Sequence, residues 1–266
     1  MTNHFIDWYK IYLKCYDSYK ITHNIDLSKF KFIDPVIIVL LFKDLITLNN
    51  SAIKCGVNVK NYLNFLIKNY NIINGSFNNY IPVVTVSKAN VDILTSQMSK
   101  IVMSKININS SNLNIKLNYI FGELMENIIQ HSRSKHNYIL SQYYNKLGLE
   151  LTFYDDGIGI PGSLKVIKNN TKECDYIFDA INGLSSKMEP GLINERGTAL
   201  PSINKMVKSY SNNEFIIISG SGIYSYSNGN EQVIPLNKKY RLNGTLISIL
   251  FKDINKFDAM DIYKYV

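Results

Sequence analysis

The second half of the chain alternates between stretches with helical and with strand-like spacing of apolar residues. Ile120, Leu124 and Ile128 recur every four residues within 117–132, which is the spacing of a helix with one wide apolar face. Residues 149–154 alternate apolar and polar side chains, and this period of two predicts a half-buried strand. The pattern also predicts strands at 138–144, 214–220, 222–227 and 246–251 and helices at 91–104 and 201–210.

The first 88 residues carry shorter patterns, which predict a small α/β unit. A strand is expected at 26–33, closed by Asp34 and Pro35, because proline fits the start of a helix. The pattern then predicts a helix at 36–48, a strand at 57–63 and a helix at 62–70. From these changes we predict three parts: a small α/β domain over 1–88, a larger domain over 89–255 and a C-terminal tail over 256–266.

The composition is that of a packed protein with a basic surface. Of the 266 residues, 46% are hydrophobic and 19% are charged, and the formal net charge is +8. A basic balance is typical of proteins that bind nucleic acid. Here, however, the lysines are scattered among Asn, Ile and Tyr, without an arginine-rich stripe. We therefore expect a solvated basic surface and no nucleic-acid partner.

Cysteine usage and the length of the apolar runs favour a cytoplasmic protein. Cys15, Cys55 and Cys174 stand far apart, so the sequence indicates neither a zinc site nor a disulfide framework. The longest apolar run, 36–42, is much shorter than the ~20 residues that a membrane span needs. Residues 1–7 show no basic segment followed by an apolar stretch, so we expect no signal peptide and no membrane partner.

Glu123 and Asn127 lie one turn apart on the predicted helix at 117–132, so both side chains can face one ligand. A carboxylate beside a bound phosphate can deprotonate a water or a hydroxyl. An amide oxygen suits a hard cation such as Mg²⁺. The same two residues would also fit the solvent face of an amphipathic helix. His131 continues the stripe, and a capping or hydrogen-bonding role is its simpler interpretation.

Asp155 directly follows the predicted strand at 149–154. A carboxylate held at a strand end can accept a hydrogen bond from an exocyclic amine such as that of adenine. Gly157 and Gly159 let the backbone approach a flat ring closely. An Asp-Asp-Gly turn without any ligand is the alternative interpretation.

Two further motifs lie at element starts. Residues 196–200 precede the predicted helix at 201–210, where backbone N–H groups and the helix dipole suit a phosphate. A helix start with nothing bound fits the same residues. Gly244 and Thr245 open the last predicted strand, where a threonine hydroxyl can reach a base or its ordered water, although such pairs are common at strand starts.

Taken together, the four motifs resemble those of the GHKL ATPase superfamily, which includes gyrase, a heat-shock chaperone, histidine kinases and the mismatch-repair ATPases. Residues 123–127 match the family's N-box, 155–159 its D-x-G-x-G box, 196–200 its second glycine box and 244–245 its terminal G-T. The P-loop motif G-x-x-x-x-G-K-[ST] does not occur in the sequence. The resemblance covers about residues 91–252 and implies an α/β sandwich that binds ATP between the sheet and a flexible lid.

The resemblance also implies a role for each motif residue. Asn127 is the expected Mg²⁺ ligand and Glu123 the expected general base. Asp155 is expected to bind the adenine amine, and the lid is expected at 163–196. The expected nucleotide-binding residues are Asp155, Gly157, Gly159, Gly197, Thr198 and Thr245, of which Gly197 and Thr198 would face the phosphates.

The second glycine box departs from the family's usual G-x-G-L-G. Ala199 and Pro201 stand where glycines are expected. Alanine resists positive φ, and proline removes an N–H that could serve a phosphate. Nucleotide affinity or lid closure is therefore expected to be weaker than in the family, while binding itself is still expected.

Two details point to one branch of the superfamily. The extension after the N-box, through His131 and Ser132, is more similar to the bacterial anti-sigma-factor kinases than to gyrase. Residues 26–35 and the helix after them resemble STAS-type domains, the fold of anti-sigma-factor antagonists; a generic α/β unit is the alternative. The expected fold class is a GHKL-type α/β sandwich preceded by a smaller STAS-like α/β domain.

The resulting hypothesis is an ATP·Mg-binding regulatory protein, either a serine/threonine kinase of the anti-sigma type or a slow ATPase, that acts as a nucleotide-dependent switch on a partner protein. The alternative is a non-catalytic protein-binding module with a degenerate nucleotide pocket. A histidine kinase is disfavoured, because it needs a phosphoacceptor histidine on an upstream helical hairpin and only His4 and His23 lie upstream. We expect a regulatory protein as partner and leave a homodimer open.

Overall fold

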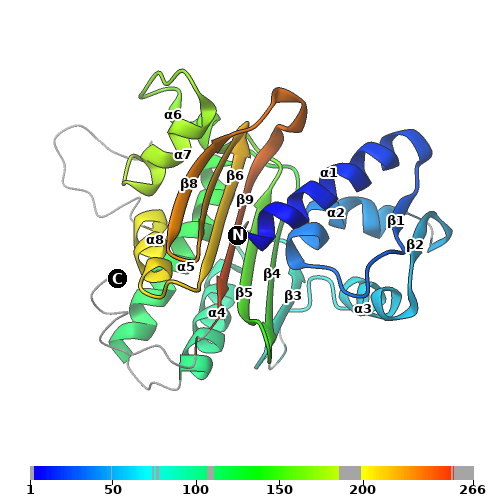
Figure 1. Cartoon of the computed structure of the whole chain (residues 1–266). Helices are drawn as coiled ribbons and strands as arrows, with labels where there is room; N and C mark the ends of the chain where they lie inside the picture. The colour runs from blue at the N-terminus through cyan, green and yellow to red at the C-terminus, as the bar shows by residue number, and fades with distance from the viewer. Residues whose placement is uncertain are drawn as a thin grey trace.

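A seven-stranded sheet forms the centre of the protein in the computed structural model, which describes residues 3–48, 50–73, 75, 78–106, 111–185, 199–252 and 254 (Figure 1). Its order is β3-β4-β5-β9-β6-β7-β8, and each of these neighbouring pairs is antiparallel. A separate parallel pair is formed by β1 (Ile25–Leu27) and β2 (Ile53–Cys55), so the fold is mixed α/β. The strands of the large sheet are β3 (Tyr80–Val84), β4 (Asn137–Tyr144), β5 (Gly148–Asp155), β6 (Glu214–Gly220), β7 (Gly222–Ser227), β8 (Asn230–Pro235) and β9 (Leu242–Phe251).

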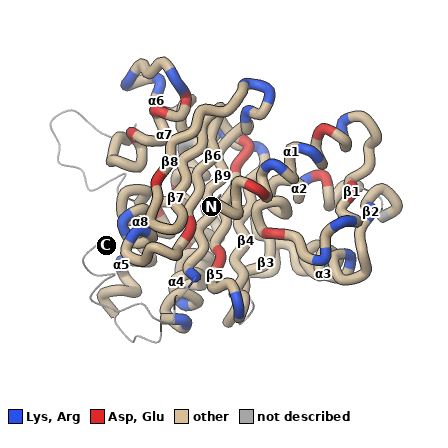
Figure 2. Tube along the Cα trace, viewed as in Figure 1, with Lys and Arg blue, Asp and Glu red and all other residues tan. Residues whose placement is uncertain are grey.

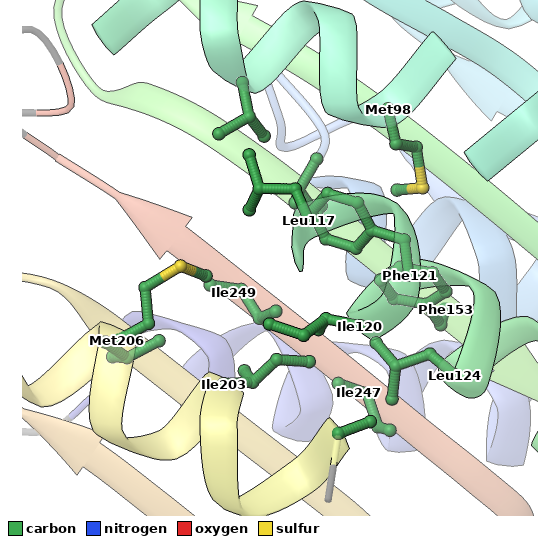
Figure 3. Packing of buried hydrophobic residues seen from close by; sticks show 14 of the residues in the cluster. Met98, Leu117, Ile120, Phe121, Leu124, Phe153, Ile203, Met206, Ile247 and Ile249 are labelled. Atoms are coloured by element: carbon green, nitrogen blue, oxygen red, sulfur yellow. The ribbon is translucent and has the colours of Figure 1, made fainter. Parts of the chain in front are cut away.

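Three helices cover one face of this sheet: α4 (Val91–Ile106), α5 (Ser111–His131) and α8 (Ala199–Lys208). The apolar stripe of α5 packs between α8 and the sheet, and Figure 3 shows Ile120 and Leu124 beside Ile203 and Ile247. Each such buried side chain contributes roughly 1.5–3 kcal/mol to folding. This packing fixes the rotation of α5 and therefore the direction of its polar stripe.

The opposite face of the sheet is covered by α1 (His4–Thr22) and α2 (Pro35–Thr47). α2 begins where the sequence predicts it, because Asp34 caps the helix by accepting the N–H of Val36 at 2.9 Å. It lies against β4 and β5 and is covered in turn by α1, so its apolar residues from Pro35 to Phe42 are all buried. α3 (Val57–Lys68) contacts the edge strand β3.

Two short helices follow β5 and form one end of the protein. α6 (Gly159–Leu164) comes directly after the turn that carries Asp155, and α7 (Glu173–Ile181) packs on β6, β7 and β8. Short 3-10 helices at Asn50–Ala52 and Lys238–Tyr240 complete the elements in the described ranges. α7 falls in the stretch 163–196 that the sequence predicts as a lid, whereas α6 lies mostly before it.

The structure corrects the predictions for the first 88 residues. The predicted strand at 57–63 is helical, because Val59, Leu63 and Leu66 recur at helical spacing and form the buried face of α3. The predicted strand at 26–33 is only the three residues of β1, and the chain turns after Leu27. α1, β2 and β3 were not predicted at all. The elements predicted from 91 onward are confirmed, with shifts of a few residues at their ends.

The predicted division at residue 88 stays a prediction. β3 falls on the N-terminal side of that boundary, yet it is the edge strand of the large sheet. Lysines and arginines are spread over several elements rather than gathered on one (Figure 2). Within the described residues, no helix combines the length and the apolar composition that crossing a membrane requires.

Candidate functional site

A cavity of about 920 Å³, including the part open to solvent, lies beside the C-terminal ends of α5 and β5. Residues of α6, α7 and α8 form the rest of its wall. Four of the predicted site residues line it: Asn127, Asp155, Gly159 and Thr245. Most of its wall is apolar and is contributed by residues including Leu124, Ile128, Phe153, Leu164, Leu200 and Ile247. The motifs that are far apart in the sequence therefore meet at one place.

Asp155 supplies the buried carboxyl group of this cavity. It is the last residue of β5, pairs with Thr245 of β9 and is only 6% exposed. Burial, with a smaller contribution from the neighbouring Asp156, raises the pKa of Asp155 to about 7, although the N–H of Gly157 opposes the shift. That N–H donates to Oδ1 at 2.9 Å, and no described residue donates a hydrogen bond to Oδ2. The cavity therefore contains a carboxyl oxygen that can accept a hydrogen bond.

The two glycines of the same motif are required by the backbone conformation of the turn. Gly157 does not line the cavity; a Cβ there would lie 1.9 Å from the carbonyl oxygen of Ser132 at the end of α5. The same carbonyl accepts the N–H of Ile158 at 2.7 Å, so the turn after β5 is held directly against α5. Gly159 does line the cavity and has φ +71°, which a larger residue would adopt only with strain.

Asp156 holds the opposite side of that turn, a role that the sequence interpretation missed. Its Oδ1 accepts the N–H groups of Lys135 and His136 at 2.8 Å, and its Oδ2 lies 2.8 Å from Nδ1 of His136. Burial alone would raise the pKa of Asp156, but these hydrogen bonds outweigh it and lower the pKa below the usual value. The two adjacent carboxyl groups thus have opposite pKa shifts, and only Asp155 lines the cavity.

Ser219 of β6 is a second residue that the sequence interpretation missed. Its hydroxyl accepts the N–H of Ile160 at 2.9 Å and donates to the carbonyl of Gly244 at 2.9 Å. The same oxygen lies 3.1 Å from Oγ1 of Thr245. Ser219 therefore fixes the start of α6 and the Thr245 hydroxyl together. No local pattern could have shown this, because the serine lies within an ordinary strand.

The structure separates the two residues of the polar stripe on α5. Asn127 lines the cavity, whereas Glu123, one turn earlier, is half-buried and is not among the residues that line it. Residues four apart share one stripe of a helix, which is why both were expected beside one ligand. From this helix the cavity is lined by Leu124, Asn127 and Ile128. The side chain of His131 lies outside the described residues.

The second glycine box is only partly described. Gly197 and Thr198, with Arg196, lie outside the described residues. Ala199 and Leu200 begin α8 and line the cavity. Pro201 is in the first turn of α8, where backbone N–H groups have no acceptor within the helix, so the proline costs the helix no hydrogen bond.

α6 and α7 form the remaining wall through Ser163, Leu164, Ala180, Leu184 and Ser185. Glu173, the first residue of α7, anchors this wall to the sheet. Its Oε2 accepts the N–H and the hydroxyl of Ser221 at 2.7 and 2.6 Å, and Arg241 lies 3.3 Å away. Burial opposes ionisation, but these donors outweigh it and lower the pKa of Glu173 to about 2.

Comparison of the chain with protein-family models and with curated proteins gives no match. What the cavity binds must therefore be argued from its own residues.

Proposed function

We propose that this protein binds ATP with Mg²⁺ in the cavity between α5, the end of β5 and α6 to α8, and that its larger part has a GHKL-type fold. The observation that carries the proposal is the Asp155 carboxyl group, buried in a largely apolar cavity with one oxygen that accepts no hydrogen bond from the described residues. A flat heterocycle with an exocyclic amine satisfies both features, since its faces contact the apolar wall and its amine donates to the carboxylate.

The donor set around Asp155 fits the rest of this ligand. The hydroxyl of Thr245, fixed by Ser219, can share hydrogen bonds with a base. The amide oxygen of Asn127 lines the same cavity and suits Mg²⁺, which prefers oxygen ligands. Bound Mg²⁺ would neutralise phosphate charge. By the resemblance, Gly197 and Thr198 would face the phosphates.

In the cell, we expect this binding to control a partner protein. Nucleotide between α5 and the wall formed by α6 and α7 would change the surface that a regulatory protein contacts. The resemblance to anti-sigma-factor kinases supports a serine/threonine kinase or a slow ATPase, with Glu123 as general base. The STAS-like assignment of the first 88 residues belongs to the same proposal.

The test is titration of the full-length chain with ATP and Mg²⁺ by calorimetry. Asp155→Asn should weaken binding by roughly 100-fold, because an amide is uncharged and has only one oxygen that can accept a hydrogen bond from the ligand amine. Asn127→Ala should bind nucleotide without dependence on Mg²⁺. Asp26→Asn, on the exposed side of β1, serves as the control and should bind like the wild type. Unchanged binding in both site variants would overturn the proposal.

A second candidate, nucleotide binding without turnover, is favoured because Glu123 is not among the described residues that line the cavity. Incubation with γ-labelled ATP distinguishes the two. Label on protein supports a kinase, and free phosphate that disappears in Glu123→Gln supports an ATPase. Tight binding with neither product would establish the binding module and remove Glu123 from any catalytic role.

A further inference from the structure

A second polar cluster lies on the opposite face of the sheet, where the starts of α1 and α2 meet β5. His4 is the first residue of α1, Asp34 is the N-cap of α2, and Glu150 projects from β5. One nitrogen or oxygen of each residue lies within 4.8 Å of the others. We propose that these three side chains bind a divalent transition-metal ion, best Zn²⁺, that joins the two N-terminal helices to the sheet.

The spacing of His4 and Asp34 suits a shared metal better than a hydrogen bond. Nε2 of His4 lies 3.4 Å from Oδ2 of Asp34. Nitrogen–oxygen hydrogen bonds usually measure ~2.7–3.2 Å. Two ligands of one tetrahedral zinc, each bonded at ~2.0–2.2 Å, are separated by ~3.4 Å. A histidine nitrogen among the donors also favours zinc over magnesium, which prefers oxygen throughout.

The other ring nitrogen of His4 already has the partner that metal-binding histidines usually have. Nδ1 lies 2.7 Å from Oε2 of Glu214, whose other oxygen pairs with Lys252. A carboxylate that accepts the Nδ1 proton leaves the lone pair of Nε2 facing Asp34, and this orients the ring for a metal. His4 remains 32% exposed at its side chain, which gives an ion and its water a route to the cluster.

Glu150 provides the independent observation that a ligand is needed here. Its side chain is 1% exposed in the middle of the sheet face. The hydroxyls of Thr152 and Ser248 lie 3.2 and 3.3 Å from its Oε1, while Oε2 receives no hydrogen bond from the described residues. A buried carboxylate oxygen without a donor is costly, and a cation removes that cost.

The charge balance gives the same result. Asp34, Glu150 and Glu214 are buried acids, and Lys252 is paired with Glu214. With His4 neutral, this set carries two negative charges, which one divalent ion neutralises. Without a metal, neutrality requires a proton on both His4 and Glu150. These two states differ in metal content, so they can be distinguished directly.

The experiment uses the full-length chain without a tag, in the absence of nucleotide and Mg²⁺. The chain is equilibrated with Zn²⁺, dialysed against metal-free buffer and analysed for bound metal; Co²⁺ titration followed by visible absorption then reports the ligand geometry. We expect one equivalent of zinc and tetrahedral cobalt bands. His4→Gln and Glu150→Gln should abolish both signals, and Glu214→Gln should weaken binding by ~10–100-fold.

His23→Gln, at the other end of α1, is the matched control and should bind zinc like the wild type. If Glu150→Gln does not fold, His4→Gln and the rise in the wild-type melting temperature on adding Zn²⁺ decide the question. A wild-type chain that retains no zinc, or a His4→Gln variant that binds as tightly as the wild type, overturns the proposal and leaves the doubly protonated cluster. Because no nucleotide is present, neither result depends on the proposed ATP site.

Discussion

Asp155 is the residue at which stability and the proposed function oppose each other. Its folded pKa of about 7 lies above the ordinary value of 3.8, because burial disfavours the charged form. The contribution of this carboxyl group to stability is therefore fully present below about pH 4 and is lost as pH rises through about 7. At neutral pH the unliganded protein keeps a partly ionised group in an apolar wall, and a ligand amine would favour that ionised form.

Asp155→Asn should therefore stabilise the unliganded protein while it weakens nucleotide binding. We expect the free energy of unfolding at pH 8 to rise by on the order of 1–4 kcal/mol, with little change at pH 4. Urea unfolding at both pH values measures this. Asp156→Asn is the matched control and should destabilise at pH 8, since its carboxylate accepts three hydrogen bonds from Lys135 and His136. Equal effects of the two substitutions on the unfolding free energy would contradict the opposite pKa shifts of Asp155 and Asp156.

Gly244 permits a second prediction at the level of one residue. Its φ is +95°, and an added Cβ would lie 1.8 Å from the carbonyl oxygen of Asp155. Gly244→Ala should cost ~3 kcal/mol or more in unfolding free energy, because β5 and β9 would have to separate. Gly122→Ala, the same change within α5, meets only Thr95 at 3.9 Å and should stabilise by ~0.5–1 kcal/mol. Thermal melts that show the same sign for both variants would refute this account.

At the scale of elements, sequence patterns worked where one face of an element is apolar, even though the polar face of β5 is buried as well. α5 and β5 were predicted because each has a single apolar face with a clear period, and both motifs of the cavity lie on them. α3 was misread because Val57 and Val59 alternate like a strand before the helical spacing of Leu63 and Leu66 begins. α1 was missed because two of its four buried residues, Tyr9 and Tyr12, are tyrosines, which an apolar pattern does not mark.

The candidate site shows the same limit. Asn127, Asp155 and Thr245 could be proposed from the sequence because short motifs carry them. Glu173 and Ser219 act through contacts between segments that are distant along the chain, and no local pattern records such contacts. Glu123 is not among the described residues that line the cavity although its neighbour Leu124 is, and this depends on how α5 packs on the sheet, which a helical period does not determine.

Glu173 makes the attachment of α7 to the sheet testable. Its lowered pKa of about 2 means that its stabilising effect is present above its ordinary value of 4.5 and is lost as pH falls toward 2. Glu173→Gln should lower the unfolding free energy at pH 7 by about 1.5–3 kcal/mol, the usual value of hydrogen bonds to a charged group, and the difference should shrink below pH 4.5.

The same variant should weaken ligand binding, because α7 carries Ala180 of the cavity wall. Urea unfolding across pH and calorimetric titration give the two readouts. Lys10→Gln removes an exposed ion pair with Asp7 on α1 and should change neither by more than ~0.5 kcal/mol. A Glu173→Gln variant with wild-type stability at pH 7 would show that α7 is held by its apolar contacts alone.

For the whole molecule, the question is whether the two predicted domains can fold separately. The outer face of the large sheet, the one opposite α4, α5 and α8, is largely apolar and is covered by α1 and α2. Asn3, just before α1, donates to the carbonyls of Phe215 and Tyr226, and β3 completes the sheet beside β4. The sheet residues that these helices cover include Tyr138, Leu140, Ile216, Ile218, Leu246 and Leu250.

A fragment spanning residues 89–266 should therefore not fold on its own. It would expose that apolar face to water and leave β4 as an unpaired edge, both of which promote association. We expect the fragment to aggregate or to melt without a cooperative transition in circular dichroism and size-exclusion experiments, whereas the full chain melts in one step. Co-expression with residues 1–88 should restore a soluble complex. A monomeric fragment with a cooperative melt would instead establish two independent domains, because the outer face would then be stable without α1 and α2.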